Sequence, residues 1–421
     1  MSAIKQCGAD ALNYGLSVAG ILTYTPTQGS TGIVRFNLAD YDGTVAVYLE
    51  INEDITYNAP LDSGPDGYAR LYDKTNSVAV TGSEIHFFSN GRKRSGDISS
   101  YFSGKGDVDV YLQIKCGNSD TTIVGWGWRL IVTQSGIISK TVIYIPISGN
   151  LAITGTTYAE DSRPKRWAHN ATNYDGTIAV YFAATLTKYT ANTMYAKLYD
   201  NTAAADITGG ELTSTSATEE FKVSGNIASN LTNGNELTVY EKVDSGTGII
   251  RNAFLIIKQT GINNGTGKFQ TVMQITNNYR TNTITSYDTG PVNNQYNPSD
   301  WNNATINFKG EYVIKRTSYS GTPSGQAHLT DDGTEISGSE LTTTSSTYER
   351  KTTGSLTTPA SASKINDGIK LTGSGTLMTV YITSSRVILT ITNLGAIAGP
   401  TLNQLMRHGK YFDGGEKPMT F

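Results

Sequence analysis

The sequence predicts an all-β protein of three tandem jelly-roll-like β-sandwich domains followed by a short C-terminal arm. Two observations predict this fold. The stretch at residues 68–85 (YARLYDKTNSVAVTGSEI) returns at 195–212 and, in altered form, at 326–341. The copies lie about 130 residues apart, too long for a solenoid repeat and typical of a whole domain. Short β-branched and aromatic runs also alternate with turn residues, as strands of a sandwich do.

The three copies set the expected domain boundaries. We expect a lead-in at residues 1–20, sandwiches at 21–138, 139–265 and 266–396, and a C-terminal arm at 397–421. Each sandwich would hold about eight short strands, the number in a jelly roll. An immunoglobulin-like sandwich is disfavoured because its paired cysteines around a tryptophan are missing. Both linkers are short, so we expect the domains to lie in a fixed row.

The first copy contains the clearest strands. Residues 31–38 alternate in the period-2 pattern of a half-buried strand, and residues 44–51 are β-branched and aromatic. In residues 68–72 the two tyrosines and the arginine share one face, and the alanine and leucine share the other. Residues 107–114 alternate again, and residues 126–134 are predicted as the closing strand.

The later copies repeat this order with increasing divergence. Residues 173–182 match residues 40–49 almost position for position, and residues 253–261 match the first closing strand. In the third copy, Asp300-Trp-Asn-Asn stands where the Tyr-Asp-Gly turn stood, and residues 386–391 close the domain. The architecture therefore follows from the repeat even where single residues have changed.

Composition excludes several functional classes. The 421 residues suffice for about three domains, and only 16% are charged, with a net charge of -3. A nucleic-acid binder would show a basic face and a high pI. No window reaches the ~20 apolar residues of a membrane span, and the first residues lack a signal peptide's apolar core. We expect no membrane insertion. If the protein acts outside a cell, we expect it to leave by a route other than a signal peptide, such as release inside a virus particle. Cys7 and Cys116 do not make a disulfide framework.

Catalytic and metal-binding patterns are missing from the sequence. The four histidines, His86, His169, His328 and His408, have neither a nucleophile elbow nor metal-ligand spacing nearby. Acidic residues are scattered, without the close pair that a glycosidase uses. The Asp40-Tyr-Asp42 and Asn173-Tyr-Asp175 turns could contribute oxygen ligands to calcium, but turns feeding a strand are the favoured reading. We expect no enzyme activity, no metal and no cofactor.

Three other groups are candidate contact sites. Trp126 and Trp128 lie on one face of the same predicted strand and could stack on a glycan, although tryptophan is also an ordinary sheet residue. The basic clusters at 92–94 and 163–166 read as solvated loops or intersubunit salt bridges, with polyanion binding as the alternative. The segment 402–421 is too short to bury its own apolar residues, so it folds back on the third domain or docks on another subunit. Its candidate assembly residues are Leu405, Met406, Arg407, Tyr411, Phe412 and Phe421.

The repeated pattern also resembles a known kind of protein. Tyr-Asp-Gly-Thr before a strand, Tyr-Ala-Arg/Lys-Leu-Tyr-Asp, Gly-Ser-Glu, Arg-Leu-Ile-Val-Thr-Gln and the ending at 406–421 resemble tandem β-sandwich (jelly-roll-like) repeat proteins of phage virions and prokaryotic surface structures. The resemblance implies assembly or adhesion and supplies no catalytic residues.

The leading hypothesis is therefore a non-enzymatic structural protein of a virus particle, such as a phage tail, fibre or capsid-decoration component. It would form homo-oligomers in the virion and contact other virion proteins. The alternatives are an extracellular filament or cell-surface structural protein and a carbohydrate-binding adhesin that contacts a host-surface glycan.

Overall fold

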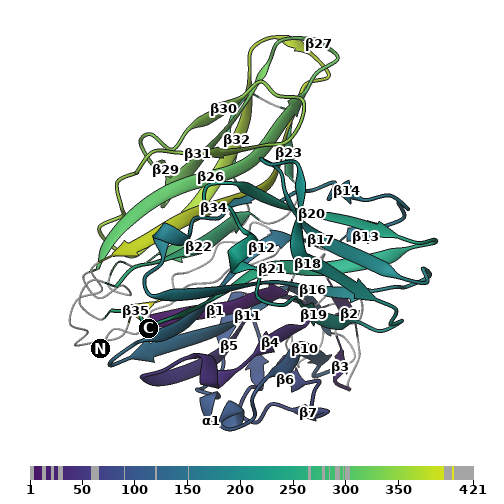
Figure 1. Cartoon of the computed structure of the whole chain (residues 1–421), viewed down its shortest axis with the longest axis vertical. Coiled ribbons are helices and arrows are strands. Elements are labelled where there is room, and N and C mark those ends of the chain that lie inside the picture. Colours follow the sequence, from purple (N-terminus) through teal and green to yellow (C-terminus); the bar gives the residue numbers. More distant parts are fainter. Residues whose placement is uncertain are drawn as a thin grey trace.

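The fold is all-β and contains three pairs of antiparallel sheets that follow one another along the chain, except that the late strand β35 (Thr401–Leu402) joins a sheet of the first pair. The computed structural model describes residues 4–11, 16–19, 23–26, 32–57, 66–89, 91–118, 121–149, 151–263, 267–276, 280–283, 285–289, 294–296, 298, 304–392 and 401–402. We call the three pairs the first, second and third sandwich. Figure 1 shows the third at the top, the second below it and the first at the bottom.

The first sandwich has one sheet in the order β1-β11-β5-β9, joined by β2 and β35, and a facing sheet in the order β3-β10-β6-β7, joined by β4 and β8. Its elements are β1 (Ile4–Ala11), β2 (Leu16–Ala19), β3 (Thr25–Pro26), β4 (Val34–Phe36), the 3-10 helix η1 (Leu38–Asp40), β5 (Thr44–Tyr57), β6 (Gly67–Asp73), β7 (Val78–Ala79), β8 (Ile85–Phe87), β9 (Gly91–Arg94), α1 (Ser99–Phe102), β10 (Val108–Cys116) and β11 (Thr121–Ser135).

The second sandwich repeats this plan with the sheets β12-β21-β16-β19 and β14-β20-β17-β18, to which β13 and β15 add. Its elements are β12 (Lys140–Ser148), β13 (Leu151–Ile153), β14 (Ala159–Glu160), β15 (Trp167–Ala168), η2 (Ala171–Asn173), β16 (Thr177–Thr187), β17 (Met194–Asp200), β18 (Ala205–Ser214), β19 (Glu220–Val223), η3 (Ala228–Asn230), β20 (Glu236–Val243) and β21 (Gly248–Thr260).

The third sandwich has the sheets β22-β34-β26-β31 and β24-β32-β28-β29, with β23, β25 and β30 at their sides and the ribbon β27-β33 at its tip. Its elements are β22 (Phe269–Thr276), β23 (Arg280–Asn282), β24 (Asp288–Thr289), β25 (Asn294–Tyr296), β26 (Thr305–Thr317), β27 (Ser320–Gly321), β28 (Ser324–Asp331), β29 (Thr334–Glu335), β30 (Leu341–Thr343), β31 (Glu349–Thr352), β32 (Ser363–Thr372), β33 (Gly375–Thr376) and β34 (Thr379–Thr392); β35 (Thr401–Leu402) follows.

Each sandwich has jelly-roll connectivity. When a strand broken in two is counted once, the first, eighth, third and sixth strands form one sheet, and the second, seventh, fourth and fifth form the other. This is the eight-stranded, two-sheet arrangement of a jelly roll, so the predicted fold class is confirmed. The strand groups change between β11 and β12 and between β21 and β22, near the predicted boundaries. Independent folding of each sandwich stays a prediction.

Alternation along the strands builds the cores. In β6, Ala69 and Leu71 are fully buried, whereas Tyr68, Arg70 and Tyr72 are only partly buried, as the sequence predicted. The corresponding strand β17 has the same pattern of buried and half-buried positions. Because a strand places alternate side chains on opposite faces, every second residue packs against the facing sheet. The hydrophobic residues of both sheets therefore meet between them.

Each of the two linkers is held by an aspartate and a glutamine at equivalent positions of the repeat. Asp42 accepts hydrogen bonds from the backbone N–H groups of Ser139 (3.0 Å) and Lys140 (3.3 Å), and Gln134 Nε2 donates to the Lys140 carbonyl (3.0 Å). In the second linker, Asp175 accepts from the Asn263 N–H at 2.8 Å. These carboxylates hold backbone N–H groups, which favours the turn reading over a calcium site.

Gln259 completes the second linker in the way that Gln134 completes the first. Its Nε2 donates to the carbonyls of Asp175 and Lys268, both at 2.8 Å. The glycine of the turn is required as well, because Gly176 has φ +65° and a Cβ there would lie 2.1 Å from the Thr260 carbonyl oxygen. The Tyr-Asp-Gly turn and the glutamine of the closing strand thus hold consecutive sandwiches in a fixed relation.

The described part of the C-terminal arm lies against the first sandwich. Strand β35 pairs antiparallel with β11, with Thr401 opposite Gln134 and Leu402 opposite Thr133. The two alternatives from the sequence were the third domain or another subunit, so for these two residues a different contact is found. Leu405, Met406, Arg407, Tyr411, Phe412 and Phe421 lie outside the described residues.

A backbone strain in the repeated turn leads to a first prediction. Ala204, in the turn after β17, has φ 52°, a left-handed conformation that costs a residue with a Cβ roughly 1–2 kcal/mol. Glycine avoids this cost but loses more entropy on folding, so we expect Ala204→Gly to stabilise the protein by about 0.5 kcal/mol. Urea unfolding measures the change. Ala203→Gly is the control, since Ala203 is outside the left-handed region, and it should destabilise; equal effects would contradict the argument.

Candidate functional site

The first two sandwiches are joined by backbone groups of one and side chains of the other. Thr185 Oγ1, on β16, accepts from the Ile33 N–H and donates to the Ile33 carbonyl, both at 3.1 Å. Tyr144, on β12, donates its hydroxyl to the Arg35 carbonyl at 2.8 Å. An ion pair of 2.6 Å joins Lys258 to Asp40. The segment just before η1 therefore lies on the outer face of the second sandwich's β12-β21-β16-β19 sheet.

The second and third sandwiches meet through the equivalent segment, which precedes η2. Arg386, on β34, is 0% exposed and donates Nη1 to the Pro146 carbonyl (3.1 Å) and Nη2 to the Arg166 carbonyl. Its guanidinium also lies 4.9 Å from the centre of the Trp167 ring. Thr383 Oγ1 donates to the Pro164 carbonyl at 2.6 Å. One arginine thus binds backbone and an aromatic ring across the junction.

A buried carboxylate compensates the charge of Arg386. Glu311, on β26 opposite Arg386, is 1% exposed; its Oε1 accepts from Arg386 Nε at 2.6 Å and its Oε2 pairs with Arg350 at 2.5 Å. Burial lowers the pKa of Arg386, and the Glu311 carboxylate opposes that shift. A charge buried this deeply is tolerated only when it is paired and hydrogen-bonded.

The same register position differs between the sandwiches. In the first, Arg129 lies opposite Glu50 and pairs with it, whereas in the second Phe254 lies opposite Ala183. Each long strand pair carries its bulge three residues before this position, at Trp126, Arg251 and Thr383 respectively. The three sheets therefore share one strand register. At this position the first and third sandwiches carry a buried ion pair, and the second carries two apolar residues.

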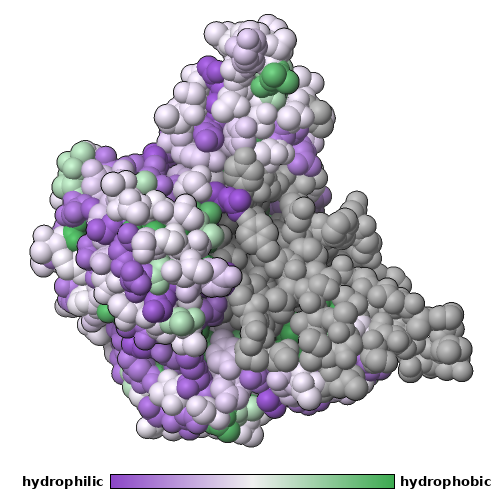
Figure 2. Space-filling view, turned by 90° about the vertical axis from the view of Figure 1, so that its right-hand side faces the viewer, coloured by the Kyte–Doolittle hydropathy of each residue, from purple (hydrophilic) through white to green (hydrophobic). Residues whose placement is uncertain are grey.

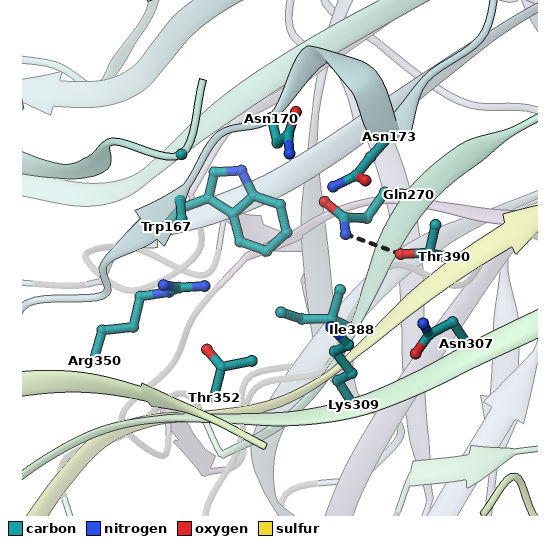
Figure 3. A pocket seen from close by; sticks show the side chains of 12 residues that line it. Trp167, Asn170, Asn173, Gln270, Asn307, Lys309, Arg350, Thr352, Ile388 and Thr390 are labelled. Atoms are coloured by element: carbon teal, nitrogen blue, oxygen red, sulfur yellow. Dashed lines mark hydrogen bonds between the residues drawn. The ribbon is translucent and has the colours of Figure 1, made fainter. Parts of the chain in front are cut away.

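The second junction encloses a cavity of about 310 Å³. Figure 3 shows Trp167, Asn170 and Asn173 of the second sandwich facing Gln270, Lys309 and Thr390 of the third. Gln270 Nε2 donates to Thr390 Oγ1 at 3.0 Å. Among the described residues, the lining contains amides, hydroxyls and two cations, Lys309 and Arg350, and no acidic side chain. This cavity has the chemistry of a polar binding pocket.

The repeated Gly-Ser/Gly-Glu signature is explained by a surface cluster in each sandwich. Tyr24 donates its hydroxyl to Glu84, Tyr158 donates to Glu211 and Tyr287 donates to Glu340. A lysine amine lies 4.1–4.6 Å from the centre of each of these rings, contributed by Lys115, Lys242 and Lys370. An exposed cation–π contact contributes about 0.5–1 kcal/mol. The strongest sequence repeat thus encodes sheet-surface contacts, which need no catalytic role.

The predicted glycan platform does not have two exposed tryptophans. Trp128 is 2% exposed and lies opposite Ile51, which is buried in the core of the first sandwich. Its ring is thus unavailable to a ligand in solvent. Trp126 is the extra residue at the β11 bulge, and its side chain lies outside the described residues. The two residues were expected on one face, but a bulge at Trp126 interrupts the alternation on which that expectation rested. Glycan binding by the chain stays a prediction.

The basic cluster at 163–166 is a junction segment, not a solvated loop. Lys165 is 1% exposed, and Arg166 pairs with Glu160 (2.9 Å) and Glu236 (3.1 Å). In the cluster at 92–94, Arg94 pairs with Glu50 at 2.8 Å. Both clusters are therefore held within the chain by at least one ion pair.

Sequence reasoning missed Arg386 and Glu311, which carry the second junction. One signal could have revealed them: charged residues stand inside two of the three closing strands at equivalent positions, Arg129 and Arg386. A charge inside an otherwise β-branched run that is buried on both faces must have a buried partner. The partner itself, 75 residues away from Arg386, was not accessible from local pattern.

The described histidines occupy structural positions. His86 pairs with Asp66 at 2.5 Å and stacks on Tyr68, and His328 stacks on Tyr287. His169 is 1% exposed, and burial lowers its pKa to about 4. His408 lies outside the described residues. Within the described ranges no histidine is hydrogen-bonded to a serine, threonine or cysteine, and no group of three potential metal ligands occurs. No described helix is long and apolar enough to cross a bilayer.

Two buried carboxylates in the second sandwich predict a pH effect. Glu241 is 4% exposed; burial and the nearby Asp161 raise its pKa well above 4.5. Because the folded state then binds more protons than the unfolded state, this contribution to stability falls as the pH rises above about 4.5. Each unit of upward shift costs ~1.4 kcal/mol once the pH exceeds the folded pKa.

We therefore expect Glu241→Gln to be more stable than the natural chain at pH 8, with a smaller difference at pH 4.5. Urea unfolding at the two pH values measures it. His169 titrates with the opposite sign, losing stability from pH 6.5 down to about 4, but it is common to both chains and cancels in their difference. A pH-independent difference would show that Glu241 is not the titrating group.

Known proteins resemble this chain only distantly. No protein-family model matches it, and no curated protein matches it. The infectious bursal disease virus VP2 subviral particle is 10% identical with a TM-score of 0.22, and the match covers 62% of this chain and 73% of that chain. A structure described as "The Triple Jelly Roll Fold and Turret Assembly in an Archaeal Virus" is 12% identical over 95% of this chain and 92% of that chain, with a TM-score of 0.18. A chain of Sulfolobus Turreted Icosahedral Virus is 12% identical over 91% and 90%, with a TM-score of 0.17. Scores this low define no shared function.

Proposed function

We propose that this chain is a non-enzymatic structural protein of a virus particle, acting as a phage tail, fibre or capsid-decoration component. The observation that carries the proposal is the way the three jelly rolls are joined. Each junction uses the same segment of one sandwich against the same sheet of the next, and each linker is held by an aspartate and a glutamine. Jelly rolls occur in viral capsids and in lectins, and rigid joining suits a load-bearing plate or rod.

The described residues on one face of the molecule form no large apolar patch. Figure 2 shows a face whose described residues are mostly hydrophilic or neutral, with hydrophobic residues scattered in small groups. Large exposed apolar residues include Tyr319 (85%) and Leu377 (81%), next to the β27-β33 ribbon. Scattered residues of this kind do not make an interface by themselves. We propose that the C-terminal arm, whose sequence holds Leu405, Met406, Tyr411, Phe412 and Phe421, makes the subunit contacts, and that the protein is located in the virion.

The test compares the mass in solution of the full chain with that of a chain ending at Leu402. This truncation keeps β35 on the first sandwich and removes only residues 403–421. We expect the full chain to form an oligomer and the truncated chain to remain folded and monomeric. Circular dichroism controls for folding. Two monomers of equal behaviour over a concentration series would contradict self-assembly, and two equal oligomers would remove the arm as the connector.

A further inference from the structure

The cavity at the second junction is a departure from the first junction. At the first junction the ion pair of Lys258 with Asp40 bridges the two sandwiches at 2.6 Å. Lys258 lies on β21 opposite Val142, and Thr390 lies on β34 opposite Gln270, at the same register of the repeated sheet. Asp40 and Asn173 are both the last residue of the 3-10 helix that precedes the Tyr-Asp-Gly turn. The bridging pair is thus replaced by Thr390 and Asn173.

A ring that fills the first junction is also missing from the second. Tyr144, on β12, lies opposite Ile256 of β21. Val272 holds the equivalent position on β22, where it lies opposite Ile388 of β34. Tyr181 of β16 is replaced in the same way by Lys309 of β26, since Thr177 and Thr305 begin the two equivalent pairings. Of the replaced positions, Lys309, Thr390 and Asn173 line the cavity of about 310 Å³ between the sandwiches.

The two charged groups of this cavity differ in their partners. Lys309 has no ion pair among the described residues, whereas the Arg350 guanidinium is paired with the Glu311 carboxylate. The described part of the lining therefore presents positive charge and amides, and no acidic side chain.

We propose that this cavity binds one sugar residue that carries a carboxylate. Lys309 provides the charge for the carboxylate, and Figure 3 shows the amides of Asn170, Asn173 and Gln270 around one space. Asn170 Oδ1 already caps η2 and Gln270 Nε2 already donates to Thr390, so the Asn173 amide, Asn170 Nδ2 and Gln270 Oε1 are the groups offered to ring hydroxyls. The volume lies at the low end of the roughly 300–1,000 Å³ of small-molecule sites, which suits a single ring. The site would make the junction both a structural joint and a glycan contact.

The experiment titrates the full chain at low ionic strength with glucuronate, glucose and sodium sulfate, using calorimetry or ligand-observed NMR. We expect saturable binding of glucuronate only. Lys309→Gln should weaken it at least tenfold, because a charge-assisted hydrogen bond is lost. The matched control is Lys364→Gln, which removes a lysine of the same sandwich outside the cavity and should leave binding unchanged.

A second variant tests the site without removing a buried group. The double substitution Asn173→Asp with Thr390→Lys copies the ion pair of the first junction into the cavity, so the fold should be retained while glucuronate binding is abolished. The proposal is overturned if glucuronate does not bind. It is also overturned if glucose binds equally well, since the charge then contributes nothing, or if sulfate competes with equal strength, since the site then recognises only an anion. Binding that survives both variants would place the sugar elsewhere on the chain.

Discussion

Replacing Glu311 with alanine is expected to destabilise the third sandwich by about 3–5 kcal/mol, the usual cost of removing one partner from a buried ion pair. Arg386 would then remain 0% exposed without its carboxylate, because its other contacts are two backbone carbonyls and the Trp167 ring. Urea unfolding gives the size of the effect. Hydrogen exchange at β26 and β34 locates it, and we expect these strands to lose protection first.

The second sandwich supplies the matched control for this experiment. It has Ala183 and Phe254 at the two equivalent positions, where they pack without any charge. The double substitution Glu311→Ala with Arg386→Phe should therefore cost less than Glu311→Ala alone, since no unpaired charge remains. A double variant as unstable as the single one would show that the lost junction contacts, and not the stranded charge, dominate.

An exposed ion pair provides the reference for the loss of stability expected at the buried pair of Glu311 and Arg386. Lys222 and Glu220 lie 3.1 Å apart with about a third of each side chain exposed. Lys222→Ala should cost no more than about 1 kcal/mol, because exposed pairs gain little in high dielectric. A comparable loss at both pairs would contradict the role given to burial.

Trp128→Ala is expected to destabilise the first sandwich by about 3–5 kcal/mol through loss of buried area and the cavity left behind. The ring is 2% exposed and stands in the core against the strand that carries Ile51. Thermal or urea unfolding followed by tryptophan fluorescence and far-UV circular dichroism measures the loss. An effect below about 1 kcal/mol would indicate that the ring is not packed as described.

Trp128→Phe is the informative companion. Trp128 Nε1 makes no hydrogen bond within the described chain, so phenylalanine removes an unsatisfied donor while it keeps most of the apolar surface. We expect it to cost less than half of what alanine costs. It is also the better variant for a glycan-binding assay, because lost binding in Trp128→Ala would report unfolding as readily as a lost contact.

Local pattern determined the jelly rolls. Alternation in β6 assigned Tyr68 and Leu71 to opposite faces before any partner strand was known, since this depends only on the backbone pleat. The Tyr-Asp-Gly turn was predicted from composition, and Gly176 does adopt the positive φ that such a turn requires. Features of this kind depend on residues a few positions apart, so a single sequence reveals them.

Local pattern did not predict that Trp128 is buried or where the candidate site lies. Trp128 is inside because β5 places Ile51 opposite it and because the bulge at Trp126 changes the alternation, neither of which is encoded within β11. The cavity needs Asn173 from one sandwich beside Gln270 from the next, and the glycan role assigned to the first sandwich had no such support.

The sequence by itself determined the repeat, the strand faces and the turns of this protein, because each rests on periodicity or on the conformational preference of one residue. Only the tertiary structure decided how the copies meet. Arg386 reaches the Pro146 carbonyl across 240 positions of the chain, and that contact exists only after two sheets have packed. A buried charge is compatible with many partners until the fold selects one, and the junction cavity follows from that selection.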